Sequence, residues 1–167
     1  VQIESVTGSG VKGDSGNSQN HFDRVTTRDL VRGFTMYGNA NTYIHCQAMR
    51  GMTAGLGGDW GFRSQESGSC YVGCIAERYA VGVDVTNYAQ GVSIHGAYAE
   101  VCGVALSISG GETPTGIRVY GLYCYHAQHE TQGAIVIGQS EGTLLSGLDI
   151  IDSISALSLE IGANAKT

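Results

Sequence analysis

The sequence predicts an all-β fold, a parallel β-helix of about six coils with a period near 25 residues. Three observations lead to this prediction. A short motif recurs at nearly regular intervals, apolar residues alternate with a period of two, and the 167 residues include 26 glycines but one proline. Alternation with a period of two is typical of strands, and glycine allows the tight corners that would join them.

The recurring motif is a five-residue segment that usually begins with glycine. Its copies are HCQAM (45–49), GCIAE (73–77), GAYAE (96–100), GLYCY (121–125) and GLDII (147–151). The glycine-led copies begin 23, 25 and 26 residues apart, and a second apolar burst follows each copy, as in GVDV (82–85) and GVAL (103–106). Each period therefore fits one coil, which stacks on the preceding coil at about 4.8 Å.

The aligned motifs also predict which side chains point inward. The second position reads Cys46, Cys74, Ala97, Leu122 and Leu148, and the fourth reads Ala48, Ala76, Ala99, Cys124 and Ile150. These small or apolar residues should form two buried ladders, because side chains alternate between the faces of a strand. The outward positions are then Gln47, Ile75, Tyr98, Tyr123 and Asp149, and Met49, Glu77, Glu100, Tyr125 and Ile151.

Length and composition place the repeats in a single unit. We expect residues 1–20 to form an irregular segment or an incomplete first coil, residues 21–163 the β-helix, and residues 164–167 a tail. The chain does not begin with Met, so we also expect it to be a piece of a longer protein. The net charge of −6 argues against a nucleic-acid partner, and no apolar run reaches the length of a membrane helix.

The cysteines are predicted to be small buried residues rather than ligands or disulfides. They number five and are scattered among apolar residues: Cys46, Cys70, Cys74, Cys102 and Cys124. Cys70 and Cys74 have no second pair at zinc-site spacing. We therefore expect reduced thiols, with Cys46 and Cys74 stacked in one column without a bond between them.

With glycine corners, scarce proline and tiny inward residues, these coils resemble right-handed parallel β-helices of the pectate-lyase type. Within that group the sequence is most similar to bacteriophage tail spikes and tail-fibre depolymerases. The resemblance covers roughly residues 20–163, is architectural, and includes no catalytic signature. It implies binding of cell-surface polysaccharide, cleavage in some members, a homotrimer and a place in the virion tail or another extracellular location. No cofactor is predicted.

Two glutamates are the first candidates for catalysis. Glu77 and Glu100 share one outward column on neighbouring coils. Carboxylates one strand spacing apart could serve as the acid and base of a glycoside hydrolase, and a separation near 5 Å fits the retaining mechanism. The alternatives are a solvated face, with Arg78 as an ion-pair partner, and a sugar-binding surface without catalysis.

Tyrosines and one tryptophan are the candidates for substrate binding. Tyr98, Tyr123 and Tyr125 should point outward, where aromatic rings suit sugars and protein interfaces alike. The segment GGDWGFRSQES (57–67) is expected to be an irregular insertion that carries function. Its candidate residues are Asp59 as a further carboxylate, Trp60 and Arg63 as substrate contacts, and Phe62 and Glu66 beside them. Alternatively, Trp60 only covers a gap in the core.

Other chemistries find little support. His126, His129 and Glu130 do not follow the H-E-x-x-H zinc pattern, and Asp149 with Asp152 lacks a calcium-loop pattern, so no metal site is predicted. Three functions remain open: a phage tail-spike or tail-fibre segment that binds and sometimes cleaves host polysaccharide, a secreted bacterial polysaccharide lyase or hydrolase, and a non-catalytic structural stalk. The candidate trimer contacts are the outward aromatic residues with Ile75 and Ile151.

Overall fold

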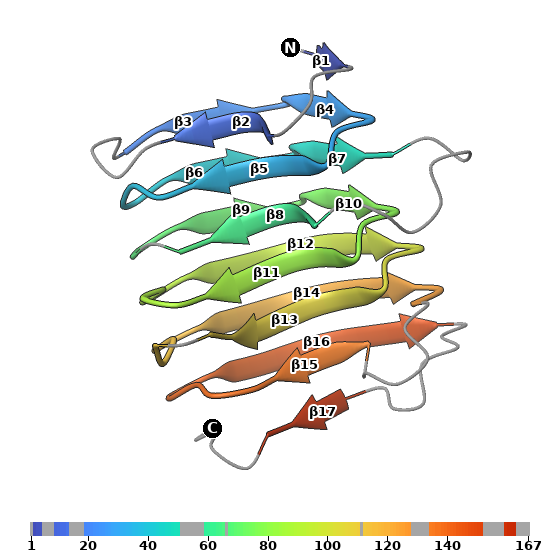
Figure 1. Cartoon of the computed structure of the whole chain (residues 1–167). Helices are drawn as coiled ribbons and strands as arrows, with labels where there is room; N and C mark the ends of the chain where they lie inside the picture. The colour runs from blue at the N-terminus through green and yellow to red at the C-terminus, as the bar shows by residue number, and fades with distance from the viewer. Residues whose placement is uncertain are drawn as a thin grey trace.

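The computed structural model has strands stacked along one axis, with the N-terminal strands at one end and the C-terminal strand at the other (Figure 1). It describes residues 2–4, 9–13, 19–50, 59–65, 67–110, 112–127, 134–151 and 159–162. Within these ranges the regular elements are all strands. No described helix is long and apolar enough to cross a membrane.

The coils contribute their strands to two parallel sheets, with two short strands or one long strand of sheet A for each strand of sheet B. Sheet A has ten strands: β1 (Gln2–Glu4), β3 (His21–Asp23), β4 (Thr26–Arg28), β6 (Thr42–Ile44), β7 (Gln47–Met49), β9 (Cys70–Val72), β10 (Ile75–Glu77), β12 (Ser93–Glu100), β14 (Arg118–Tyr125) and β16 (Leu144–Ile151). Sheet B has seven strands: β2 (Ser9–Gly13), β5 (Arg32–Met36), β8 (Trp60–Ser64), β11 (Val81–Thr86), β13 (Val104–Ser109), β15 (Ile135–Ile137) and β17 (Leu159–Ile161).

This arrangement confirms the predicted fold class, a parallel β-helix with a period near 25 residues. The solenoid makes about five turns, close to the expected six coils. The last three residues of the motif lie in a strand of sheet A, and a further segment of sheet A precedes the motif, such as β6 or β9, which the alignment of two bursts did not reveal. The strands β1 and β2 pair with β4 and β5 and so extend the solenoid towards the N-terminus.

A corner divides sheet A into two halves. In the first coils it separates β3 from β4, β6 from β7 and β9 from β10, whereas β12, β14 and β16 run through it. One residue of each coil has a positive φ at this corner: Arg24, His45, Gly73, Gly96, Gly121 and Gly147. Glycine adopts this conformation without the steric cost that other residues meet, which explains why it opens most copies of the motif.

The predicted inward ladders are confirmed. Ala76 pairs in register with Ala48 and Ala99, and Leu122 pairs with Ala97 and Leu148. All of these residues except Leu148 are buried, and Leu148 is half-buried in the last turn of sheet A. The alternation along each strand therefore sets the register that the sequence predicts.

The fourth-position ladder is small because the two sheets approach closely there. Gly33 and Gly61 of sheet B lie against Ala48 and Ala76 of sheet A. A Cβ atom added to Gly61 would lie 2.8 Å from the Cβ atom of Ala76, closer than real Cβ contacts. Larger residues in either column would force the sheets apart.

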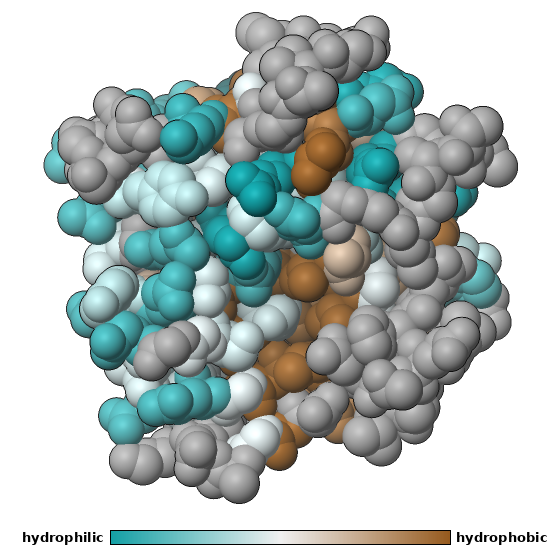
Figure 2. Space-filling model, viewed as in Figure 1, coloured by the Kyte–Doolittle hydropathy of each residue, from teal (hydrophilic) through white to brown (hydrophobic). Residues whose placement is uncertain are grey.

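The interior changes in character along the axis. Aromatic residues fill the N-terminal half, where Phe34 stacks on Phe62 at 4.8 Å and Tyr43 stacks on Tyr71 at 4.6 Å. Aliphatic residues such as Leu106, Ile108, Ile135 and Ile137 fill the C-terminal half. In the last coil Leu159 and Ile161 continue the columns of Ile135 and Ile137 but are 41% and 53% exposed. Figure 2 accordingly shows apolar residues at the surface of the lower central region.

The expectation of an irregular insertion over residues 57–67 is wrong for the part that the structure describes. Trp60–Ser64 is the regular strand β8, paired with β5 and β11 in the middle of sheet B. Phe62 points into the core and is fully buried. Residues 51–58 and Glu66 lie outside the described residues.

The five cysteines are free, as predicted. Cys46 and Cys74 occupy the same inward column on successive coils. Their thiols lie 3.4 Å and 3.5 Å from the carbonyl oxygens of Phe22 and Tyr43, respectively, so each acts as a weak donor to the backbone.

The thiols should differ sharply in reactivity. Burial raises the pKa of Cys74 and of Cys102 to about 12 and that of Cys124 to about 11, and the thiolate is the reactive form. Cys70 is half-buried and lies in an outward column between Thr42 and Ser93. We expect a thiol reagent such as DTNB to modify Cys70 alone in the folded protein and the other cysteines only after unfolding. Rapid modification of more than one thiol at neutral pH would contradict this burial pattern.

Candidate functional site

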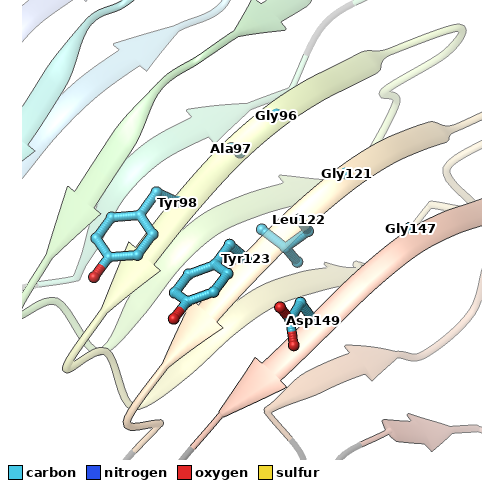
Figure 3. Close-up of a pocket in the computed structure, with 8 residues that line it drawn as sticks. All are labelled: Gly96, Ala97, Tyr98, Gly121, Leu122, Tyr123, Gly147 and Asp149. Carbon is cyan, nitrogen blue, oxygen red and sulfur yellow. The ribbon is translucent and has the colours of Figure 1, made fainter.

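The candidate site is a depression on the outer face of sheet A, where β12, β14 and β16 bend at the corner. It has a volume of about 280 Å³. Its lining residues are Gly96, Ala97, Tyr98, Gly121, Leu122, Tyr123, Gly147 and Asp149 (Figure 3). Ala97 and Leu122 point inward, so the glycines and these two residues form its floor, and Tyr98, Tyr123 and Asp149 stand along one side.

Glycine keeps the floor of this depression open. A Cβ atom added to Gly96 would have no heavy atom within 4 Å, so it would project into empty space above the corner. The earlier coils differ at this position. His45 carries a side chain, and its ring lies 2.6 Å from where a Cβ atom of Gly73 would be. The open corner therefore begins beyond Gly73 and runs along Gly96, Gly121 and Gly147.

Two tyrosines form the aromatic side of the depression. Tyr98 and Tyr123 are register partners whose rings stack with centroids 5.1 Å apart and planes 24° apart. Burial and a hydrogen bond to the Glu100 carboxylate raise the pKa of Tyr98 to about 12. Tyr98 therefore keeps its phenolic proton at neutral pH, and its hydroxyl donates a hydrogen bond to the Glu100 carboxylate.

A second aromatic stack stands across the corner. The rings of His95 and Tyr120 stack with centroids 5.1 Å apart and planes 22° apart. These residues precede Gly96 and Gly121 by one position and belong to the first half of β12 and β14. The open glycine corner therefore lies between two stacked pairs of rings.

The structure brings Glu77 and Glu100 together as predicted. They are register partners on β10 and β12, and Tyr125 follows in the same column on β14. The Glu77 carboxylate accepts an ion-paired hydrogen bond of 3.2 Å from the Arg78 guanidinium, and both side chains are 20% exposed. The two glutamates thus have different partners, since Glu77 is bonded to Arg78 and Glu100 accepts from Tyr98.

Asp59, Trp60 and Arg63 lie elsewhere, on the sheet B side of the solenoid. Trp60 is 7% exposed and its indole N–H donates to the Thr35 hydroxyl at 2.9 Å. The guanidinium carbons of Arg63 and Arg32 lie 3.2 Å and 4.7 Å from the centre of its ring. The ring of Trp60 therefore packs within its own sheet and offers little surface to a ligand.

Ion pairs hold both arginines in place. Arg32 is bonded to Asp59 at 2.6 Å, and Arg63 is bonded to Asp84 at 2.6 Å. Burial raises the pKa of Asp84, while the Arg63 guanidinium acts in the opposite direction. Asp59 is thus an ion-pair partner directly before β8, and the corner of residues 78–80 separates it from Glu77.

The described residues contain no group of three metal-ligating side chains. Asp149 is described and exposed, but Asp152, His129 and Glu130 lie outside the described residues, so the possible ligand sets discussed above are incomplete.

The amino-acid sequence alone did not lead us to several residues of the site. Gly96, Gly121 and Gly147 served only as markers of the repeat, and His95 and Tyr120 were not singled out. Extending the aligned motif by one position towards the N-terminus gives Val72, His95, Tyr120 and Ser146, which would have revealed the second stack.

Comparison with known proteins gives no relative: no family model, no curated protein and no solved structure matches the chain. The fold and the geometry of the depression therefore carry the functional conclusion.

Proposed function

We propose that this protein is a β-helix segment of a phage tail spike or tail fibre that binds a host surface polysaccharide along the corner of sheet A. The observation that carries the proposal is the depression over the glycine corner, lined by Tyr98, Tyr123 and Asp149. A virion-tail or other extracellular location belongs to the same proposal.

The chemistry of this surface suits a sugar chain. Phenol hydroxyls and a carboxylate supply hydrogen-bonding groups, while ring faces and the glycine floor supply apolar surface beside them. The glycines lie one above another on successive coils, so the corner is extended along the solenoid axis. An extended oligosaccharide could lie along it and contact several coils at once, which is how a rigid repeat scaffold presents a binding surface.

Trimer formation is also part of the proposal, with contacts away from the depression. Tyr125 and Ile151 are register partners at the far end of sheet A, and they are 36% and 39% exposed. Interface cores favour such aromatic and aliphatic side chains over charged ones. This assigns Tyr125 to subunit contact and leaves Tyr98 and Tyr123 for the sugar.

Cleavage of the polysaccharide is the second candidate function, as in a secreted hydrolase of this fold. It is favoured by the in-register pair Glu77 and Glu100 next to Tyr98. A lyase of the pectate type is less favoured because the described residues hold no cluster of calcium-binding carboxylates. A structural stalk would need neither the glutamate pair nor the open glycine corner.

Alanine substitutions of the two tyrosines test the binding proposal. We expect Tyr98→Ala and Tyr123→Ala each to weaken binding of the polysaccharide about tenfold, since a lost aromatic contact of about 1.4 kcal/mol corresponds to that factor. Binding is measured by retention of the protein on a panel of immobilised bacterial capsules and lipopolysaccharide O-chains.

Tyr88→Ala is the matched control. Tyr88 is 66% exposed, its hydroxyl contacts Glu112, and neither residue lines the depression. Its loss should leave binding unchanged. If retention does not depend on Tyr98 and Tyr123, or if no polysaccharide retains the protein, the assignment of this surface is refuted.

A further inference from the structure

Both aromatic stacks beside the glycine corner end at the same coil. Tyr123 stacks on Tyr98 and Tyr120 stacks on His95, all within β12 and β14. The next strand, β16, places Asp149 in the column of Tyr123 and Ser146 in the column of Tyr120. The faces of Tyr123 and Tyr120 that are turned towards β16 therefore meet small polar residues instead of another ring.

This change from rings to short side chains makes a notch at β16. Gly147 forms its floor, and a Cβ atom added there would lie 3.3 Å from the backbone nitrogen of Gly121, so the floor is packed directly on the preceding coil. Ser146, Gly147 and Asp149 are all exposed. Figure 3 shows Tyr123 and Asp149 side by side at the depression, with Asp149 beyond the stacked rings.

We propose that this notch holds one sugar unit of the bound chain and selects a neutral or amino-bearing unit over an acidic one. This inference rests on the proposed polysaccharide binding and specifies its substrate class. The sugar's apolar face lies on the free face of Tyr123. Its hydroxyl or ammonium groups donate hydrogen bonds to the Asp149 carboxylate, which has only acceptor oxygens when ionised.

The charges around the notch support this selection. A uronic acid unit at this place would put its carboxylate next to that of Asp149, and like charges a few ångströms apart repel. Glu100 adds a second negative charge on the same face, on β12, two strands away from Asp149 on β16. The nearest positive side chain on β14 is Arg118, which opens the strand and pairs with Leu144, two residues before Tyr120.

The test compares the protein with its Asp149→Asn variant on polysaccharides of three classes, with neutral, amino-bearing and acidic repeat units, at physiological salt. Asp23→Asn is the matched control, because Asp23 is also exposed on the outer face of sheet A but lies at its N-terminal end and contacts Arg24. Thermal unfolding checks that both variants remain folded.

We expect the parent protein to bind neutral or amino-bearing polysaccharides. Asp149→Asn should weaken that binding about tenfold, the scale of one hydrogen bond to a charged group, and should reduce the discrimination against acidic chains. Asp23→Asn should behave like the parent. Preference of the parent for acidic chains overturns the inference, and so does binding that depends on Tyr98 and Tyr123 but not on Asp149. Absence of binding to all three classes overturns the proposed function itself.

Discussion

Replacing Phe62 with alanine is expected to lower the free energy of unfolding by about 3–5 kcal/mol, the range measured for large aromatic residues in protein cores. Phe62 is fully buried and stacks on Phe34, and its ring centre lies 6.4 Å from that of Tyr43 and 5.9 Å from that of Tyr71. Small domains are stable by about 5–15 kcal/mol in total, so this one cavity should remove a large share. Denaturant unfolding followed by circular dichroism measures the loss.

Two further variants make this result interpretable. Tyr88→Ala removes an aromatic ring that is 66% exposed and should change stability by about 0.5 kcal/mol or less. Phe62→Leu keeps most of the apolar volume and should be destabilised less than Phe62→Ala, which gives a measurable value if the alanine variant does not fold. Equal stability of Phe62→Ala and Tyr88→Ala would mean that Phe62 does not lie in a packed interior.

The sequence predicts the fold well because the constraint on each coil is local. Strand alternation and stacking force residues such as Ala76 and Ala99 into one inward column, and that column is visible in a simple alignment. The alignment stopped at His45, although the preceding coil has the same corner at Arg24. A positive φ costs an ordinary residue only about 1–2 kcal/mol, so a fold can accept Arg24 or His45 where glycine is the preferred residue.

The misreading of β8 has a different physical cause. Glycine and aspartate before Trp60 suggest a loop, yet Gly61 is needed in a strand because sheet A lies so close to it. The tryptophan looked like an exposed sugar contact because sequence does not reveal that Arg63 and Arg32 pack over its ring. Those contacts join residues of neighbouring strands whose pairing the sequence alone does not specify.

The candidate site was predictable in part. The outward column containing Tyr98 and Tyr123 follows from alternation alone, and so does the neighbourhood of Glu77 and Glu100. The depression does not follow, because it depends on the direction in which sheet A bends at Gly96 and its equivalents. That direction is a property of the backbone in three dimensions. The same glycines would also be compatible with a corner that bends in the opposite direction.

The glutamate pair leads to the second large expected effect. Glu77→Gln and Glu100→Gln should each lower the rate of oligosaccharide release by about 10²–10⁴-fold on any polysaccharide that the protein cleaves, the usual contribution of a positioned acid or base. Glutamine keeps the shape of the side chain, so binding should change little. Glu112→Gln is the control, since Glu112 is exposed and its carboxylate accepts a hydrogen bond from the Tyr88 hydroxyl.

The two glutamates have different partners. Glu77 is bonded to Arg78, while Glu100 lies nearer the depression through its hydrogen bond with Tyr98. Parallel strands are about 4.8 Å apart, which is close to the carboxylate separation of retaining glycosidases. Mass spectrometry of the released oligosaccharides measures the rates, and retention of configuration at the new sugar end is the expected stereochemistry. If both variants cleave like the parent, the pair is a solvated face. If the parent releases nothing from any chain that it binds, the protein is a binding segment and cleavage is refuted.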